Sequence, residues 1–471
     1  MHTLEQLRSG ALAGARRLNL SAQLRSVPPE VFDLADTLEV LNLSGNQLAS
    51  LPHDLPRLHR LKVIFCSDNP FTHLPEVLGD CASLQVVGFK ACRIAEVRAQ
   101  ALPAQLRWLI LTDNAITELP DALGQRPALQ KLMLAGNRLR QLPQSLAQAH
   151  QLELLRLSAN ALEAVPPWLT ALPRLSWLAL AGNPIDWSAA SPAMHPAPTL
   201  FTPHAAPHSQ STPLPALHWN DLQVDTLLGE GASGHIYRVR SAAHPQGLAL
   251  KLFKGAVTSD GLPEHELAAS IAAGQHPALI TPCAELAGHP QGARGVLLPL
   301  IAPSFINLAG PPSLESCTRD VYAPTLHMDV ATAVEVARQI ADAVAHLHQR
   351  GILHGDLYAH NILWNPATAQ ALLSDFGAAT LLPAAGNPVR RALQALEVRA
   401  FGCLLDELLA LVRAGPATGA GPGAGQGTAP GAGAGAALAG LRAITHACLL
   451  PQPSQRPEMA AVCAQLAFIR T

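Results

Sequence analysis

Four polar residues in the second half of the chain have the types and the spacing for chemistry on a phosphate group. Asp356 stands five residues before Asn361 in the stretch HGDLYAHNIL, Asp375 follows in SDFG, and Lys251 ends the stretch LALK. Carboxylate and amide oxygens are the ligands that Mg²⁺ prefers, so Asn361 and Asp375 are candidate metal ligands. Asp356 could accept the proton of an attacking hydroxyl, and Lys251 could neutralise phosphate oxygens. Together these residues predict phosphoryl transfer.

A glycine-rich stretch, LLGEGASGHIYRV, precedes the lysine. Gly229, Gly231 and Gly234 form a G-x-G-x-x-G pattern, which alone is a weak signal because dinucleotide-binding folds share it. Here the glycines are followed by Ile236 and other strand-like residues instead of a helix, and a second apolar run then leads to Lys251. The pattern therefore predicts a hairpin whose backbone amides lie close to phosphates.

One helix is expected to support the stretch around Asp356 from behind. Residues from about Val330 to Gln349 have apolar side chains at helical spacing, and Gly351 follows as a plausible residue beyond the helix end. The expected buried face consists of Ala337, Ile340, Ala341, Val344 and Leu347.

The first half of the chain repeats with a period of 23 residues, apart from one step of 22. Each unit reads L-x-x-L-x-L-x-x-N-x-L, which is the leucine-rich-repeat pattern. The asparagine position is occupied by Asn46, Asn69, Cys92, Asn114, Asn137, Asn160 and Asn183, and Gln23 marks a degenerate first unit. One unit cannot bury its leucine face alone, so neighbours must stack into a solenoid in which the asparagine amides bind adjacent backbone. Cys92 lacks the amide, so a local irregularity is expected there.

Large apolar residues also occupy the positions that should line the concave face of the solenoid. They are Val63, Phe65, Trp108, Ile110, Met133, Leu154 and Trp177. Such a column on an exposed sheet indicates a protein-binding surface. The alternative is that the linker or the second half of the chain covers it.

Composition limits the remaining possibilities. The net charge of −2 gives no reason to expect a nucleic-acid partner, and no apolar run is long enough for a membrane span. The first twenty residues lack a secretory apolar region, and the eight cysteines are scattered, so a reduced, cytoplasmic protein is expected. Pro-, Ala- and Ser-rich residues 188–217 predict a disordered linker, and Gly- and Ala-rich residues 414–435 predict a disordered insertion. The expected domains are therefore residues 15–187 and 218–471.

The segment from Trp219 to Phe468 resembles a eukaryotic-type protein kinase domain. The glycine-rich loop, LALK, HGDLYAHN, SDFG, the stretch EVRAFGCLLDELL from Glu397 and CLLPQPSQRP from Cys448 follow one another in the order of that family. With the repeats, the chain resembles bacterial cytosolic leucine-rich-repeat protein kinases. The resemblance implies a multidomain α/β plus α+β protein, in which a repeat solenoid is joined by a Pro/Ala linker to a bilobal kinase fold.

The same resemblance implies ATP and Mg²⁺ as cofactors and gives roles to further residues. Lys251 should pair with a carboxylate of the next helix, with Glu266 preferred and Glu264 as the alternative. Asp356 should act as the base, with Asn361 and Asp375 holding the metal. The nucleotide site should contain Leu228, Gly229, Gly231, Gly234, Ile236, Ala249, Lys251, Glu266 and Leu363.

Four departures from the family pattern bear on activity. Gly355 replaces an arginine, Tyr358 replaces a lysine that helps to neutralise phosphate, and Glu397 replaces an aspartate. The segment after Gly377 is short, contains no A-P-E motif and offers one hydroxyl, Thr380. The glutamate that normally pairs with the counterpart of Arg456 belongs to that motif, so this partner is missing.

Three functions stay open on this reading. The first is a protein kinase, serine/threonine-specific in preference to tyrosine-specific, whose repeats recruit a protein substrate or regulator. The second is a nucleotide-binding pseudokinase scaffold whose repeats mediate protein–protein interaction. The third is a small-molecule phosphotransferase, which the missing substrate platform favours, although the intact glycine-rich loop and SDFG argue against it.

Overall fold

The computed structural model describes residues 2–187, 214–231, 233–254, 257–258, 260–413 and 431–470. The chain divides into two compact units. The first comprises Met1–Asp186 with the short piece Ala256–Leu262, and the second comprises Trp187–Gly255 with Pro263–Thr471.

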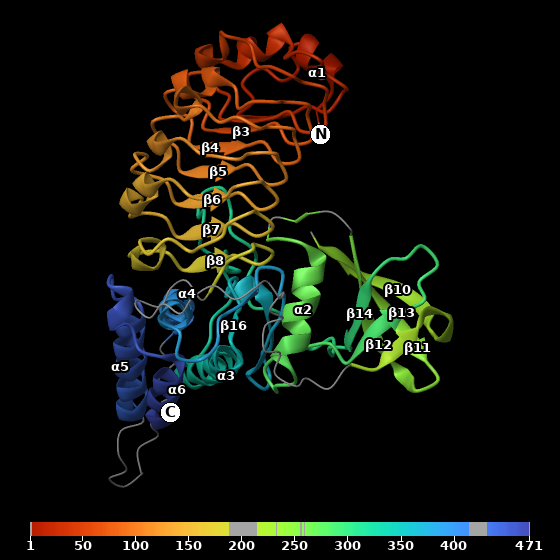
Figure 1. Ribbon diagram of the computed structural model, residues 1–471, viewed down its shortest axis with the longest axis vertical. Helices are drawn as coiled ribbons and strands as arrows, with labels where there is room; N and C mark the ends of the chain where they lie inside the picture. The colour runs from red at the N-terminus through yellow and green to blue at the C-terminus, as the bar shows by residue number, and fades with distance from the viewer. Residues whose placement is uncertain are drawn as a thin grey trace, which may run out of the picture. The chain divides into compact units, whose positions relative to one another are not determined.

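The first unit is built on a parallel sheet of eight short strands in chain order (Figure 1). The first strand, β1, pairs in register with β2, so the degenerate unit at Gln23 does extend the solenoid. The strands are β1 (Arg17–Asn19), β2 (Val40–Asn42), β3 (Val63–Phe65), β4 (Val86–Gly88), β5 (Trp108–Ile110), β6 (Lys131–Met133), β7 (Leu154–Arg156) and β8 (Trp177–Ala179). A short helix precedes the sheet, α1 (Leu4–Arg8), and single 3₁₀ turns return the chain between strands, at Pro29–Leu34, Leu55–Arg57, Glu76–Asp80, Ala99–Ala101, Asp121–Leu123, Gln144–Gln148 and Leu169–Ala171.

The asparagine column binds the backbone of adjacent turns, as predicted. Asn69, for example, donates from Nδ2 to the carbonyls of Leu43 (2.9 Å) and Cys66 (3.1 Å), and its Oδ1 accepts from the Leu48 amide (2.8 Å). At the next position the Cys92 thiol lies 3.5 Å from the Cys66 carbonyl in the same orientation. Strand β4 pairs in register with both neighbours, so the irregularity expected near Cys92 is absent from the sheet.

The apolar column on the sheet is less exposed than the sequence suggested. Phe65, Trp108, Ile110 and Met133 are half-buried, whereas Trp177 is 1% exposed and is not a free surface residue. The Lys131 ammonium lies 4.2 Å above the Trp108 ring, in cation–π geometry.

The second unit begins with a six-stranded sheet in the order β10-β11-β12-β14-β13-β9, with helix α2 (Pro263–Ala273) beside it (Figure 1). Its core contains Val239, Leu250 and Leu297, and Leu267 of α2 packs with Phe253 and Val296. The strands are β9 (Ala216–His218), β10 (Gln223–Glu230), β11 (Gly234–Ser241), β12 (His244–Phe253), β13 (Ala284–Ala287) and β14 (Gly295–Pro299).

Strand β9 corrects the expected linker. Ala216–His218 pairs in parallel with β13, so the ordered sheet begins inside the 188–217 segment that was expected to be disordered. This edge strand is possible because three residues with extended backbone suffice to satisfy the free edge of β13. Residues 188–213 of that segment lie outside the described residues.

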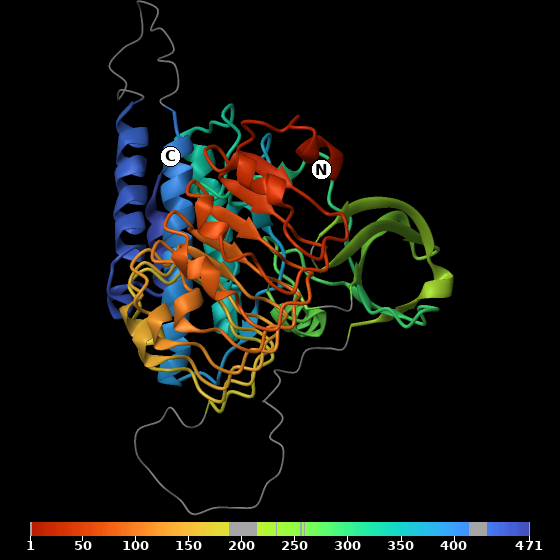
Figure 2. The same ribbon diagram turned by 90° about the horizontal axis from the view of Figure 1, so that it is seen from above.

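The rest of the second unit is helical around small sheets. Helix α3 (Val330–Gln349) matches the predicted bounds, its predicted apolar face is fully buried, and Gly351 beyond its end has a φ of +73°. Helix α4 (Pro388–Leu411) lies beside α5 (Gly431–Cys448), as the two blue helices of Figure 2 show. Helix α6 (Met459–Phe468) packs on α3. The small strands are β15 (Ile306–Asn307), β16 (Ile352–Leu353), β17 (Ile362–Asn365), β18 (Gln370–Leu373) and β19 (Thr380–Leu381), and 3₁₀ turns occur at Trp219–Asp221, Ala359–Asn361 and Pro453–Gln455.

The start of α5 corrects the second low-complexity prediction. Residues 431–435, expected to be part of a disordered insertion, already belong to this helix. Alanine, the best helix former, alternates with glycine there, and α5 as a whole packs on α4. Residues 414–430 lie outside the described part of the chain. Within the described part, no helix has both the length and the apolar character that a membrane crossing needs.

Candidate active site

The sheet and α2 bring Lys251 and Glu266 together as a buried ion pair. Lys251 comes from near the C-terminal end of β12 and Glu266 from the first turn of α2, and their side chains are 12% and 7% exposed. Burial raises the pKa of Glu266, and the Lys251 ammonium only partly offsets this. The other candidate, Glu264, lies 3.9 Å from Arg294 at the surface. Of the two carboxylates, Glu266 is therefore the partner of Lys251.

The glycine-rich stretch forms the predicted hairpin between β10 and β11. The Gly231 amide donates to the Gly234 carbonyl across the turn (2.9 Å). A Cβ at position 234 would lie 2.3 Å from the Leu252 carbonyl oxygen, so only glycine fits there. At Gly229 and Gly231 an added Cβ would meet nothing within 4 Å, so this backbone is open to a ligand.

The remaining residues predicted for the nucleotide site lie in the same unit. Ile236 pairs with Lys251 across β11 and β12, and Ala249 pairs with Leu298 of β14. Leu228 is 49% exposed on β10, whereas Leu363 lies on β17. Their contact with a nucleotide stays a prediction.

The stretch from Asp356 to Asn361 is a compact loop fixed by its own polar groups. The Asn361 Nδ2 donates to the Asp356 carboxylate (2.8 Å) and to its backbone carbonyl (2.9 Å). Ser374, next to Asp375, donates to the Asn361 carbonyl from its amide and its hydroxyl (2.9 and 2.8 Å). The loop is thereby joined to the strand end that carries Asp375.

Asp375 itself is exposed and has a left-handed backbone, with a φ of +62°. One carboxylate oxygen accepts from the Gly377 amide at 3.0 Å. Since the Asn361 nitrogen is used by Asp356, the Asn361 amide oxygen is the atom left to bind a cation. One carboxylate and one amide oxygen suit Mg²⁺, which takes its other ligands from water and phosphates.

Glu397 of α4 holds the start of the loop. Its carboxylate, 1% exposed, accepts from the Gly355 amide (2.7 Å) and from the His348 Nε2 of α3 (2.8 Å). Burial raises the pKa of Glu397, but its bond to His348 and nearby charges outweigh this, so its pKa is lowered. Gly355 has a φ of +74°, a conformation that favours glycine over the arginine of the family pattern. The role of His348 was not predicted, and the signal that could have found it is its helical spacing with the buried residues of α3.

His354 has a packing role. It is fully buried, its Nε2 donates to the Ser374 carbonyl (3.0 Å), and its ring lies 5.4 Å from that of Phe376. Its ring nitrogens therefore serve the loop and not a substrate.

Two contacts join the end of α2 to the end of α3. The Arg350 Nε donates to the Ala272 carbonyl (2.7 Å), and the His346 Nε2 donates to the Ala273 carbonyl (2.8 Å). These carbonyls are at the C-terminus of α2, where cationic or donor groups are favourable. The contacts fix the helix that carries Glu266, and no sequence pattern indicated them.

The departures from the family pattern have structural counterparts. Thr380 is 3% exposed and pairs with Leu353 in the β16–β19 ladder, so it is a strand residue and not an accessible hydroxyl. Arg456 donates to the carbonyls of Leu450 (2.8 Å) and Ala395 (3.0 Å), and burial lowers its pKa to about 10. Backbone oxygens thus bind the guanidinium.

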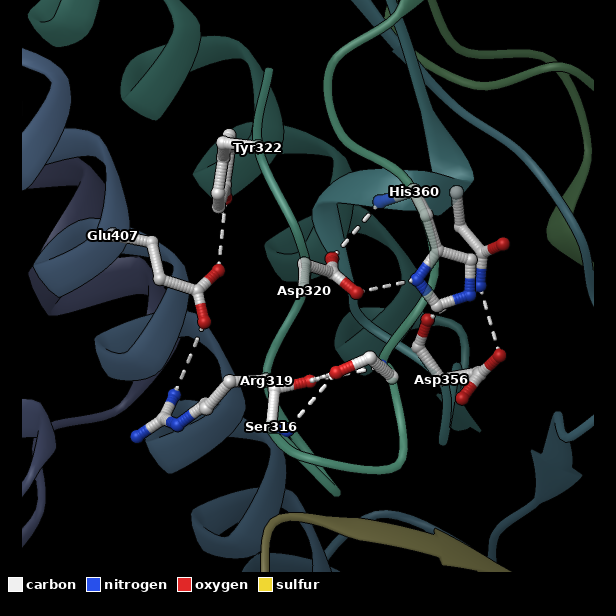
Figure 3. Close-up of polar contacts among 9 residues, drawn as sticks. Ser316, Arg319, Asp320, Tyr322, Asp356, His360 and Glu407 are labelled. Carbon is white, nitrogen blue, oxygen red and sulfur yellow. Dashed lines mark hydrogen bonds and ion pairs between the residues drawn. The ribbon is translucent and has the colours of Figure 1, made fainter. Parts of the chain in front are cut away.

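The sequence reading also missed a polar cluster beside the loop (Figure 3). The Asp320 carboxylate accepts from the His360 backbone amide (3.0 Å) and its Nδ1 (2.7 Å). The His360 ring lies 5.0 Å from that of Tyr358. Burial alone would lower the pKa of His360. The hydrogen bond to Asp320 and the negative charges of Asp356 and Asp375 have a larger effect in the opposite direction, so the pKa is raised.

Comparison with known proteins agrees with this geometry. A model of the protein kinase domain matches residues 222–395, and leucine-rich-repeat models match residues 37–58, 104–162 and 127–185. The serine/threonine-protein kinases PknJ of Mycobacterium bovis and Mycobacterium tuberculosis are each 30% identical to this chain over 170 residues. That stretch is 34% of this chain and only 26% of each relative. The chain thus carries leucine-rich repeats in its first half and a protein kinase domain in its second.

Proposed function

We propose that this protein is an ATP-dependent protein kinase that transfers the γ-phosphoryl group to a hydroxyl of a protein substrate. The observation that carries the proposal is the buried Lys251–Glu266 ion pair, formed in a unit that also contains Asp356, Asn361 and Asp375. A lysine held by a carboxylate keeps its charge at a fixed place, where it can bind phosphate oxygens. Serine or threonine is the proposed acceptor, because the matched relatives are named serine/threonine-protein kinases.

The residues divide the chemistry among them. The hairpin between β10 and β11 would lie over the phosphates of ATP, since its glycines let the phosphates come close to the main chain, and Lys251 would neutralise them. Mg²⁺, held by Asp375 and the Asn361 amide oxygen, supplies positive charge against the phosphates when it is bound. Asp356 orients the acceptor hydroxyl and takes its proton, and Asn361 fixes that carboxylate by donating to it at 2.8 Å.

The test is transfer of labelled γ-phosphate to the protein itself and to a generic protein acceptor, measured with Mg²⁺ beside Asp356→Ala and Asp375→Ala. Each variant should retain its fold and lose activity by at least about a hundredfold, because preorganised charge is lost at the reacting group. Nucleotide binding without turnover would support a pseudokinase scaffold instead. Turnover confined to small acceptors would support a small-molecule phosphotransferase. Phosphoamino-acid analysis of the product distinguishes serine and threonine from tyrosine.

We further propose that the repeats recruit the substrate or a regulator through Phe65, Trp108, Ile110 and Met133. Neighbouring strands place these residues on one face, and the Phe65 ring lies over Gly88, where an added Cβ would be 2.5 Å from it. Half-buried aromatic residues of this kind often dominate binding at interfaces. Trp108→Ala should weaken capture of the partner with no change in ATP turnover. Arg25→Ala, a substitution of a peripheral residue in the same unit, is the control. Parallel loss of capture and turnover in Trp108→Ala would count against a recruiting role.

A further inference from the structure

The segment of residues 308–323, called here the 308–323 loop, is a folded structure beside the candidate active site. Leu308 donates from its amide to the carbonyl of Ile362 (2.9 Å), which directly follows residues 355–361, called here the catalytic stretch. Gly310 and Val321 form an antiparallel bridge with two hydrogen bonds (2.9 and 3.0 Å), which closes the loop. At its tip the Ser316 hydroxyl accepts from the Ser313 amide (2.9 Å). The loop therefore has a defined shape of its own.

Asp320 projects from this loop onto the catalytic stretch (Figure 3). Its side chain is fully buried, and its two oxygens bind one residue, His360, at two points: the backbone amide and Nδ1. A carboxylate can only accept, so the His360 Nδ1 must donate, which fixes both the ring and the backbone. A buried carboxylate with both oxygens used in this way is a precise positional constraint.

His360 lies within the short turn Ala359–Asn361, which follows the proposed base Asp356 and ends at the proposed metal ligand Asn361. Asn361 is its neighbour in the chain and donates to the Asp356 carboxylate at 2.8 Å. A shift of the His360 backbone would therefore displace the Asn361 amide and, with it, the orientation of Asp356. Asp320 thus acts on the reacting groups through the backbone of one residue.

The loop is in turn fixed to helix α4 on both sides of Asp320. Arg319 and Tyr322 both bind Glu407, at 3.4 Å and 2.8 Å (Figure 3). The same helix carries Glu397, which accepts from the Gly355 amide at the other end of the catalytic stretch. One rigid helix therefore holds the stretch at its start directly and at its end through the 308–323 loop.

We propose that Asp320 is a positioning residue for phosphoryl transfer, which holds the His360–Asn361 end of the catalytic stretch as Glu397 holds the Gly355 end. The inference rests on the kinase activity proposed above. Loss of Asp320 should leave the nucleotide-binding sheet intact, because both carboxylate oxygens of Asp320 bind His360 and not a residue of β10, β11 or β12. The effect should therefore fall on kcat and on the dependence on Mg²⁺, and not on the KM for ATP.

The experiment compares Asp320→Ala and Asp320→Asn with Asp329→Ala in the full chain. Asp329 caps α3 by accepting from the Thr332 amide (2.7 Å), so its loss also removes a carboxylate contact, but one made within α3 and not to the His360 backbone. Asp320→Ala should lower kcat by roughly 10- to 100-fold with KM for ATP within about threefold, because small displacements of reacting groups have effects of that size. Asp320→Asn keeps one acceptor for the His360 amide and should lie between Asp320→Ala and the wild type. Asp329→Ala should lose thermal stability and keep kcat.

A second measurement does not depend on activity. Hydrogen–deuterium exchange of peptides that span residues 352–365 should be faster in both Asp320 variants than in the wild type, and unchanged in Asp329→Ala. If the wild type transfers no phosphate, the proposed function fails, and exchange alone decides the positioning role. Exchange rates in the Asp320 variants equal to those of the wild type would overturn the inference. So would a loss of kcat that parallels the loss of thermal stability in the Asp320 and Asp329 variants alike. If Asp320→Ala does not fold, the nearly isosteric Asp320→Asn provides the same comparison.

Discussion

The buried carboxylate of Glu407 predicts a dependence of stability on pH that one substitution should remove. Its side chain is 16% exposed, and burial raises its pKa from 4.5 to about 7, although Arg319 and Tyr322 act in the opposite direction. The folded protein therefore holds a proton on Glu407 more tightly than the unfolded chain does. The stability from this group is fully present below about pH 4.5 and is lost as pH rises through about 7.

The magnitude follows from the size of the shift. The difference between about 7 and 4.5 is about 2.5 pKa units, and each unit corresponds to about 1.4 kcal/mol, so the group contributes on the order of 3 kcal/mol. Glu407→Gln retains an acceptor for Tyr322 and cannot ionise. The variant should therefore gain up to about 3 kcal/mol relative to the wild type between pH 4.5 and pH 8.

The assay is urea unfolding of both proteins across that pH range. The free energy of unfolding is compared for the transition whose midpoint changes on substitution. Other groups that titrate in this range cancel in the difference between the two curves. Tyr322→Phe removes a hydrogen bond that favours the carboxylate, so it should make the total loss of stability at high pH larger. Parallel curves for the wild type and Glu407→Gln at all pH values would refute the reasoning.

Three further predictions concern the catalytic stretch. Glu397→Asp shortens the side chain by about 1.5 Å, so two hydrogen bonds to a buried carboxylate are lost, and we expect about 2–4 kcal/mol of destabilisation and reduced turnover. An unchanged free energy of unfolding would contradict this. Gly355→Arg restores the family residue at a φ of +74°, so we expect about 1–2 kcal/mol of destabilisation and no gain in activity. A more stable or more active variant would count against the role given to this glycine. Thr380→Ala, at a buried strand position, should keep turnover within about twofold, as should phosphatase treatment of the wild type; a tenfold loss in either experiment would reveal a phosphate switch.

The elements that sequence reasoning predicted well are those defined by local periodicity. The 23-residue repeat placed Asn46 and its counterparts because every unit must meet its neighbour in the same way. Helix α3 was predicted to the residue because its apolar spacing and its end signal agree. Lys251, Asp356, Asn361 and Asp375 could be placed from ordered motifs, and the structure brings them into one unit.

What the sequence missed depends on contacts between distant segments. Asp320 is 40 residues from His360, and Tyr322 is 85 residues from Glu407, with no period or motif to connect them. Strand β9 has only three residues, and its pairing with β13 supplies the stability that its composition does not indicate. The frequent glycines at the start of α5 predict disorder, but packing of the whole helix overrides that local preference.

The contacts between α2 and α3 bear on the choice of inhibitors. A ligand of the proposed nucleotide site could bind with α2 in place or only after α2 has moved away from α3. In this protein such displacement breaks the bonds from Arg350 and His346 to the last carbonyls of α2, as well as the Lys251–Glu266 pair. Two hydrogen bonds at about 1 kcal/mol each make the displaced state at least about 30-fold rarer, and the apparent affinity of such a ligand falls by the same factor. Compounds that accept the helix in place are therefore the better starting point for chemical probes of this protein.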